Sequence, residues 1–138
     1  MRAILDTNAQ VADLKSALGA SHRLISLVKA EQVRPAVTTP LAVEYESVLN
    51  RPGMLPPAFG ADEITGFLDW FVSVSTRHRV HYWWQPRLPD PQDDLVLEAA
   101  MATSARHLIT FNVRHFRDLA SFGIVVFTPG QFLKHLQL

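Results

Sequence analysis

Five polar residues have the side-chain types and the positions in sequence that could support catalysis: Asp6, Glu44, the adjacent pair Asp93 and Asp94, and Asn112. Their side chains offer oxygen atoms as ligands, which suits Mg²⁺ or Mn²⁺ and disfavours zinc. Acids brought together repel one another unless a cation lies between them, and such a cation lowers the pKa of a bound water. If these residues meet in space, the set predicts metal-dependent hydrolysis of a phosphodiester.

The elements that must position these residues follow from the hydrophobic pattern. Short apolar runs alternate with segments of helical period, a pattern typical of a parallel sheet covered by helices. We therefore predict an α/β fold, a three-layer α/β/α sandwich with a mostly parallel central sheet, in a single domain spanning residues 1–138. The expected strands are 3–5, 34–38, 80–83, 107–111 and 124–127, and the expected helices are 11–18, 24–28, 39–50, 64–72, 95–101 and one from residue 129. Thr39 and Thr128 each precede a proline, which predicts that each caps a helix.

The polar residues fall at the ends of these elements. Asp6 and Asn112 follow two predicted strands, and the pair Asp93 and Asp94 opens the buried helix 95–101. In an open parallel sheet, residues beyond the carboxyl ends of the strands converge at one edge, where ligands bind. We expect these side chains to share that edge.

Glu44 is expected to join them from the helix 39–50. At about 100° per residue it lies beside Val48, at the margin of an apolar stripe that runs from Leu41 to Leu49. Burying an unpaired charge is costly, so a carboxylate at this margin needs a partner. No Lys or Arg stands three or four positions from Glu44.

Composition narrows the function classes. The chain has 13 basic and 13 acidic residues and a formal net charge of +0, so no global field attracts polyanions. The absence of Cys rules out disulfides, thiolate catalysis and iron–sulfur ligation, and is compatible with a cytoplasmic protein. No apolar run approaches the roughly 20 residues that span a bilayer, and no secretory signal is apparent, so no membrane association is expected.

Candidate RNA-binding residues flank the acids. Residues 77–87 form the densest basic and aromatic cluster, in which Trp84 is expected to stack on an unpaired base; the alternative is that the tryptophans of this cluster belong to the core. Arg114 and His115 follow Asn112 closely and are predicted to contact RNA. Trp70 and Val74 lie off the main stripe of helix 64–72, which predicts a partner surface.

Four segments, in order along the chain, resemble the PIN-domain family, and in particular the toxin components of VapBC-type toxin–antitoxin pairs. They are residues 5–8 (LDTN), 43–49 (VEYESVL), 88–98 (LPDPQDDLVLE) and 109–116 (ITFNVRHF). The similarity covers essentially the whole chain. It implies a metal-dependent endoribonuclease with an α/β/α fold, usually dimeric and neutralised by a small antitoxin.

The resemblance assigns the site residue by residue. Asp6 matches the first acid of the family, Glu44 the second and Asp94 the third, with Asp93 as a reserve one residue out of register. Asn112 occupies the fourth position, which is Asp in many members and Asn in some. This departure removes one negative charge, so a second metal ion is expected to bind more weakly there.

The resemblance also places Thr7 and Thr110 at positions where small hydroxyl residues often support the acids in this family. The predicted function is therefore a Mg²⁺- or Mn²⁺-dependent ribonuclease, the toxin of a toxin–antitoxin pair, acting on RNA as a cytoplasmic homodimer. One alternative is a PIN-like module, inactive through Asn112, that binds RNA or a protein. A second is a haloacid-dehalogenase-type phosphatase with Asp6 as nucleophile, although the usual second acid is replaced by Asn8.

Overall fold

A five-stranded, all-parallel sheet forms the centre of the molecule in the computed structural model, which describes residues 2–15, 20–78 and 91–136. Its order is β3-β2-β1-β4-β5. The strands are β1 (Arg2–Leu5), β2 (Arg34–Thr38), β3 (Thr76–His78), β4 (His107–Ile109) and β5 (Val125–Phe127). The chain moves outward from β1 to β3 and then returns to β4 on the other side of β1. The strand order therefore reverses between β1 and β4, the position at which α/β sheets bind ligands.

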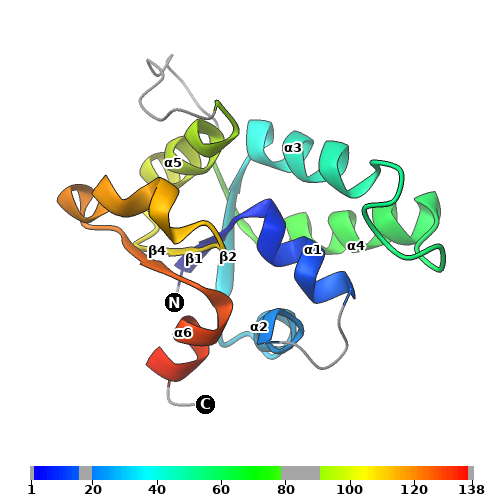
Figure 1. The fold of residues 1–138 in the computed structure, drawn as a ribbon, viewed down its shortest axis with the longest axis horizontal. Helices are drawn as coiled ribbons and strands as arrows, with labels where there is room; N and C mark the ends of the chain where they lie inside the picture. The colour runs from blue at the N-terminus through cyan, green and yellow to red at the C-terminus, as the bar shows by residue number, and fades with distance from the viewer. Residues whose placement is uncertain (1, 16–19, 79–90, 137–138) are drawn as a thin grey trace.

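Helices cover both faces of this sheet. In Figure 1, α1 to α4 lie on one side of the strands, and α5 with the 3₁₀ segment η1 lies on the other, which confirms the predicted α/β/α arrangement. The helical elements are α1 (Thr7–Lys15), α2 (Ala20–Lys29), α3 (Thr39–Leu49), α4 (Ala61–Ser73), α5 (Pro91–Thr103), η1 (Val113–Phe122) and α6 (Pro129–His135). None of the helices in the described ranges is long and apolar enough to cross a membrane.

Three helices, α2, α4 and α5, begin three or four residues before the predicted starts, at Ala20, Ala61 and Pro91. Two further differences at helix starts follow from hydrogen bonds. α1 begins at Thr7 and not near residue 11, because the Asp6 carbonyl accepts a hydrogen bond from the Ala9 N–H directly after the strand. α3 is capped by Thr38 and not by Thr39: the Thr38 hydroxyl accepts a hydrogen bond from the Leu41 N–H at 3.4 Å. The prediction that Thr128 caps α6 is confirmed.

The strand boundaries also differ. The third strand of the chain, β3, pairs with β2 and comprises Thr76–His78. The segment 80–83, predicted as this strand, lies outside the described residues. β4 ends at Ile109, two residues before the predicted end, and β5 begins at Val125. Beyond β4 the backbone still bonds its neighbour, since the Thr110 N–H donates to the Phe127 carbonyl at 2.9 Å.

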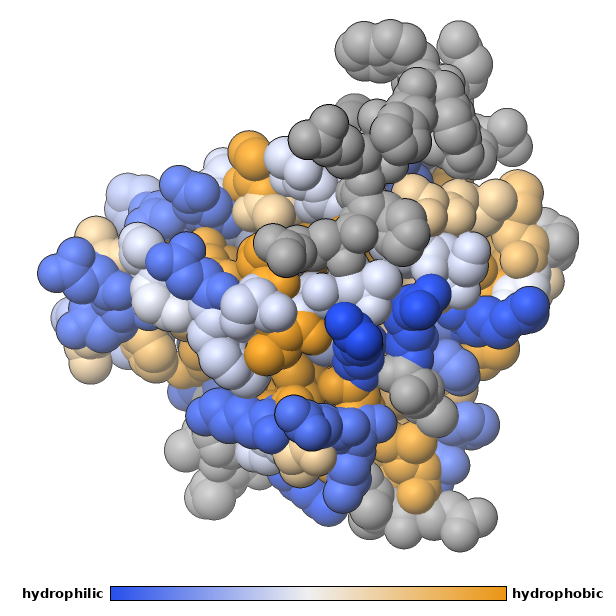
Figure 2. All heavy atoms as spheres, turned by 180° about the vertical axis from the view of Figure 1, so that it is seen from behind, coloured by the Kyte–Doolittle hydropathy of each residue, from blue (hydrophilic) through white to orange (hydrophobic). Residues whose placement is uncertain are grey.

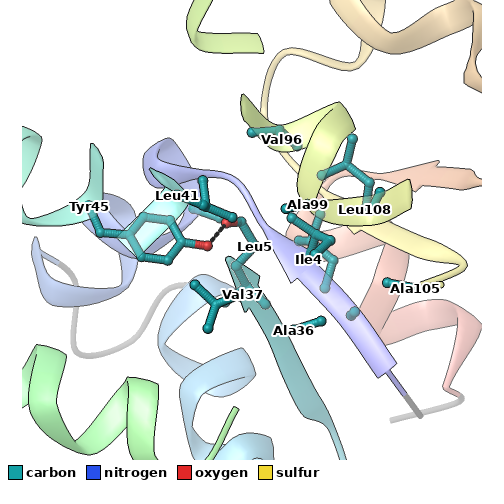
Figure 3. Close-up of a cluster of buried hydrophobic side chains, with 14 of the residues drawn as sticks. Ile4, Leu5, Ala36, Val37, Leu41, Tyr45, Val96, Ala99, Ala105 and Leu108 are labelled. Carbon is teal, nitrogen blue, oxygen red and sulfur yellow. Dashed lines mark hydrogen bonds between the residues drawn. The ribbon is translucent and has the colours of Figure 1, made fainter. Parts of the chain in front are cut away.

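Much of the core lies between strands β1 and β2 and the helices on either side of them. Figure 3 shows Ile4 and Leu5 of β1 and Ala36 and Val37 of β2 among side chains of α3 and α5. Strands buried on both faces are continuously apolar, which explains why β1 and β2 do not alternate with polar residues.

Tyr45 connects this core to the end of β1. It is fully buried, and its hydroxyl donates a hydrogen bond to the Leu5 carbonyl, the dashed line in Figure 3. Burial raises the pKa of Tyr45 well above 10, and the negative charge of Asp6 raises it further. The phenol therefore stays protonated and keeps donating. This bond fixes α3 against the strand end that carries Asp6.

The surface is of mixed polarity. On the face shown in Figure 2, hydrophilic side chains cover much of the molecule and apolar patches lie between them. Large apolar side chains that are exposed among the described residues include Val43, Phe111, Phe122 and Val125.

Candidate active site

A cavity of about 280 Å³ opens beyond the carboxyl end of β1, where the strand order reverses. It brings together residues that are far apart in the sequence. Its lining consists of Asp6, Thr7, Asn8, Val11, Ala12, Leu41, Glu44, Val48, Arg51, Met54, Asp93, Val96 and Asn112. Three carboxylates and two carboxamides therefore line one space, from the ends of two strands and the N-terminal halves of α1, α3 and α5.

Asp6 is the most constrained of these acids. Its Oδ1 accepts a hydrogen bond from the Thr7 N–H at 2.7 Å, and its Oδ2 accepts one from the Thr110 hydroxyl at 2.7 Å. The Asp6 N–H donates to the Ile109 carbonyl at 2.9 Å. Donors on both carboxylate oxygens fix the orientation of the group. Thr7 and Thr110, predicted as supporting residues, both contact Asp6 directly.

Thr110 also connects the end of β4 to the start of α1. Its buried hydroxyl oxygen accepts hydrogen bonds from the Asn112 N–H at 3.0 Å and from Asn8 Nδ2 at 3.4 Å. Asn8 Oδ1 in turn accepts from the Phe111 N–H at 3.2 Å. Sequence analysis had not assigned Asn8 to the site. Its position two residues after Asp6, in the turn that leaves β1, was the available signal.

The first turn of α5 places Asp93, and not Asp94, in the cavity. The Asp93 residue is 6% exposed, lines the cavity, and has its Oδ2 2.9 Å from His115 Nδ1. Asp94 is partly exposed and is not among the residues that line the cavity. Its charge acts instead on Glu98, one turn further along α5, whose pKa is raised by burial and by Asp94. Consecutive helical residues point about 100° apart, and here Asp93 lines the cavity whereas Asp94 does not.

Arg51 introduces a positive charge that sequence analysis had not assigned to the site. It is exposed and lines the cavity together with the partly buried Glu44. Arg51 follows Glu44 by seven positions, which is about two helical turns. Extending the helical period of α3 beyond its last residue would therefore place both residues on the same face of the helix. The cavity thus combines acids with one cation at its border.

The donor set fits a hard divalent cation. The ligands on offer at Asp6, Glu44, Asp93 and Asn112 are all oxygens, as Mg²⁺ and Mn²⁺ require. Within the described ranges, no three acidic or histidine side chains lie close enough together to bind one ion directly. Mg²⁺ in proteins usually keeps several waters and takes one or two carboxylates. The positive ends of α1 and α5, which begin next to Asp6 and Asp93, reduce the repulsion among the acids.

The predicted RNA-binding residues occupy different surroundings. His115 is paired with Asp93 at the border of the cavity. Arg114 is exposed and lines a separate groove between η1 and β5, together with Phe116 and Arg117. Trp84 lies outside the described residues.

A second cavity, of about 460 Å³, lies between α1, α2 and α4. Its lining residues are Asp13, Leu14, Ile25, Lys29, Phe59, Phe67 and Trp70. Lys29 Nζ lies 5.9 Å from the centre of the Trp70 ring, within reach of a cation–π contact. Val74, predicted with Trp70 to form a partner surface, lines a neighbouring pocket that Trp70 also borders.

Burial raises the pKa of Asp13 to about 7, although the charge of Lys29 opposes the shift. Between about pH 4 and pH 7 the folded protein therefore binds a proton that the unfolded chain has lost, and the free energy of unfolding falls as pH rises. In the wild type, Asp13 should lower the free energy of unfolding by on the order of 2 kcal/mol across this range. We expect this pH dependence to be absent in Asp13→Asn. Urea unfolding at pH 5 and pH 8 measures it, with the exposed Asp62→Asn as control. Equal pH dependence in the wild type and in Asp13→Asn would contradict this prediction.

Two findings from the comparison with known proteins describe what this chain is similar to. A family model described as "PIN domain" matches residues 2–114, a range that includes every described residue of the acidic cavity. The solved structure of VapBC2 from Rickettsia felis, bound to a DNA fragment from their promoter, contains a chain that matches with a TM-score of 0.60 and 16% identity. The match covers 93% of this chain and 98% of that one, and shows a shared fold. No curated protein sequence matches the chain.

Proposed function

Because this chain belongs to the PIN-domain family, we propose that it is a metal-dependent endoribonuclease that hydrolyses phosphodiester bonds of RNA. PIN domains are generally nucleases, so the family supports a hydrolase. The observation that carries the finer proposal is the cavity itself, where Asp6, Glu44, Asp93 and Asn112 face one space at the reversal of strand order.

The cavity suggests a role for each of its polar residues. One or two of the carboxylates of Asp6, Glu44 and Asp93 would bind Mg²⁺ or Mn²⁺ directly, and the remaining acid and Asn112 would bind it through its waters. A bound ion supplies an acidic water and neutralises charge on the reacting phosphate. Asp93 replaces Asp94 in this proposal because Asp93 lines the cavity.

The surrounding residues prepare the site for this chemistry. The Thr7 N–H and the Thr110 hydroxyl hold Asp6 in a fixed orientation. Arg51, exposed at the border of the cavity, is suited to contact a phosphate of the bound strand. Contacts of Arg114 and Trp84 with RNA stay predictions.

We also propose that the protein is the toxin of a toxin–antitoxin pair and acts as a cytoplasmic homodimer. The fold that it shares with a chain of the VapBC2 structure supports an antitoxin partner. We assign to that partner the cavity between α1, α2 and α4, because the partly buried aromatic side chains of Phe67 and Trp70 border it.

The proposed activity is tested with purified protein and a single-stranded RNA of mixed sequence. We expect cleavage with Mg²⁺ or Mn²⁺ and none with EDTA. Mn²⁺ at about 100 times its Kd is expected to stabilise the fold by about 2.7 kcal/mol. Stabilisation by Mn²⁺ without cleavage of any RNA would instead favour a binding module, and cleavage that persists in EDTA would exclude the metal mechanism.

A further inference from the structure

His115 connects two of the segments that form the acidic cavity. Its Nδ1 lies 2.9 Å from Asp93 Oδ2, so the ring on η1 bonds the first turn of α5. Its backbone N–H donates to the Asn112 carbonyl at 3.0 Å. One residue therefore contacts both Asp93 and Asn112, which approach the cavity from different elements.

The two partners differ strongly in exposure. The Asp93 side chain is 9% exposed, and that of His115 is 48% exposed. The carboxylate is thus held at the wall of the cavity, while the imidazole closes the contact from the solvent side. A donor at Nδ1 restricts the rotation of the Asp93 side chain, because one of its two oxygens is engaged.

Hydrogen bonds of this kind orient carboxylates that bind metal ions, and their loss typically costs 10- to 100-fold in metal affinity or activity. We propose that His115 is a positioning residue: its ring fixes the orientation of the Asp93 carboxylate at the cavity wall. Its expected contact with RNA is not required for this role. The proposal rests on the proposed function in assigning a cation to Asp93.

Two substitutions of His115 by an amide side chain distinguish a role of Nδ1 from a role of Nε2. The amide of His115→Asn can place an N–H near the position of Nδ1, whereas that of His115→Gln places one near Nε2. We expect His115→Asn to keep the Mn²⁺ affinity and kcat within about threefold. His115→Gln and His115→Leu should weaken Mn²⁺ binding, measured by calorimetry without RNA, by about 10- to 100-fold.

A matched control is His135→Gln, since His135 is an exposed histidine on α6, away from the cavity. All variants should unfold at temperatures within a few degrees of the wild type, so that a change in Mn²⁺ affinity reports on the site and not on folding. If His115 acted by contacting RNA, His115→Gln would preserve function, and the other variants would raise KM with Mn²⁺ affinity unchanged. That pattern would overturn the proposal.

A measurement without metal or RNA separates this proposal from the proposed function. In ¹⁵N-histidine spectra of the metal-free protein, the His115 Nδ1 resonance should report a hydrogen bond and should shift in Asp93→Asn. An unchanged resonance in that variant would overturn the proposal even if the protein cleaves RNA. If the wild type neither binds Mn²⁺ nor cleaves RNA, the proposed function and the positioning role toward a cation both fail, whatever the spectra show.

Discussion

Replacing Asp6 with Asn is expected to lower the rate of RNA cleavage by about 100- to 1,000-fold at saturating Mg²⁺. The change removes one negative charge from the centre of the site and keeps the shape of the side chain. A metal ion at a reacting phosphate contributes several kcal/mol, and each 1.4 kcal/mol changes the rate tenfold. The Thr7 N–H can still donate to the remaining carbonyl oxygen, so the local fold should persist.

Single-turnover cleavage of an end-labelled RNA measures this effect, because it excludes changes in product release. Asp62→Asn is the matched control: Asp62 is an exposed acid in the first turn of α4, outside the cavity, so the same chemical change there should leave the rate within about twofold. Circular dichroism and thermal unfolding check that both variants fold. A rate for Asp6→Asn within threefold of the wild type would remove Asp6 from the mechanism.

The second large effect distinguishes two adjacent residues. Asp93→Asn is expected to reduce cleavage by about 100-fold, since its carboxylate lines the cavity and is bound by His115. Asp94→Asn is expected to stay within about threefold, since Asp94 is partly exposed and not among the lining residues. Each variant removes one charge from the same helical turn, so the pair controls for the effect of net charge on RNA binding.

The two variants differ in a further measurable way. Loss of the Asp94 charge removes one cause of the raised pKa of Glu98, so the pKa of Glu98 should fall in Asp94→Asn, which ¹³C spectra of the carboxyl group can follow. Mn²⁺ affinity should fall in Asp93→Asn and stay unchanged in Asp94→Asn. A larger loss of cleavage in Asp94→Asn than in Asp93→Asn would restore the assignment made from the sequence.

Much of the fold could be predicted from local patterns. Some features depend only on residues that are neighbours in sequence, and these could be predicted. They are the apolar runs at β1 and β2, the helical periodicity of α4 and the Thr-Pro start of α6. The PIN-domain resemblance and the α/β/α fold are confirmed by the family match and the parallel sheet. The wrong predictions concern the ends of helices and strands. At α3, for example, a hydrogen bond from the Leu41 N–H makes Thr38 the cap, and residue type does not distinguish it from Thr39.

The site was only partly predictable for a related reason. Strand ends indicated Asp6 and Asn112, and the margin of an apolar stripe indicated Glu44, because periodicity tells which side of an element a residue occupies. The choice between Asp93 and Asp94 needs the rotation of α5 about its axis. That rotation is set by packing of Val96 and Ala99 against the sheet, which involves residues distant in sequence.

The sequence by itself determined the residue types, their order and the sheet edge at which they gather, since these depend on hydrophobic period and chain direction. The tertiary structure alone decided which atoms meet. Two contacts join distant segments: the Thr110 hydroxyl donates to Asp6, 104 residues away, and the His115 ring bonds Asp93. The packing also places Arg51 in the lining of the cavity. Such contacts arise only when the helices pack on the sheet, because no local interaction sets the distance between elements.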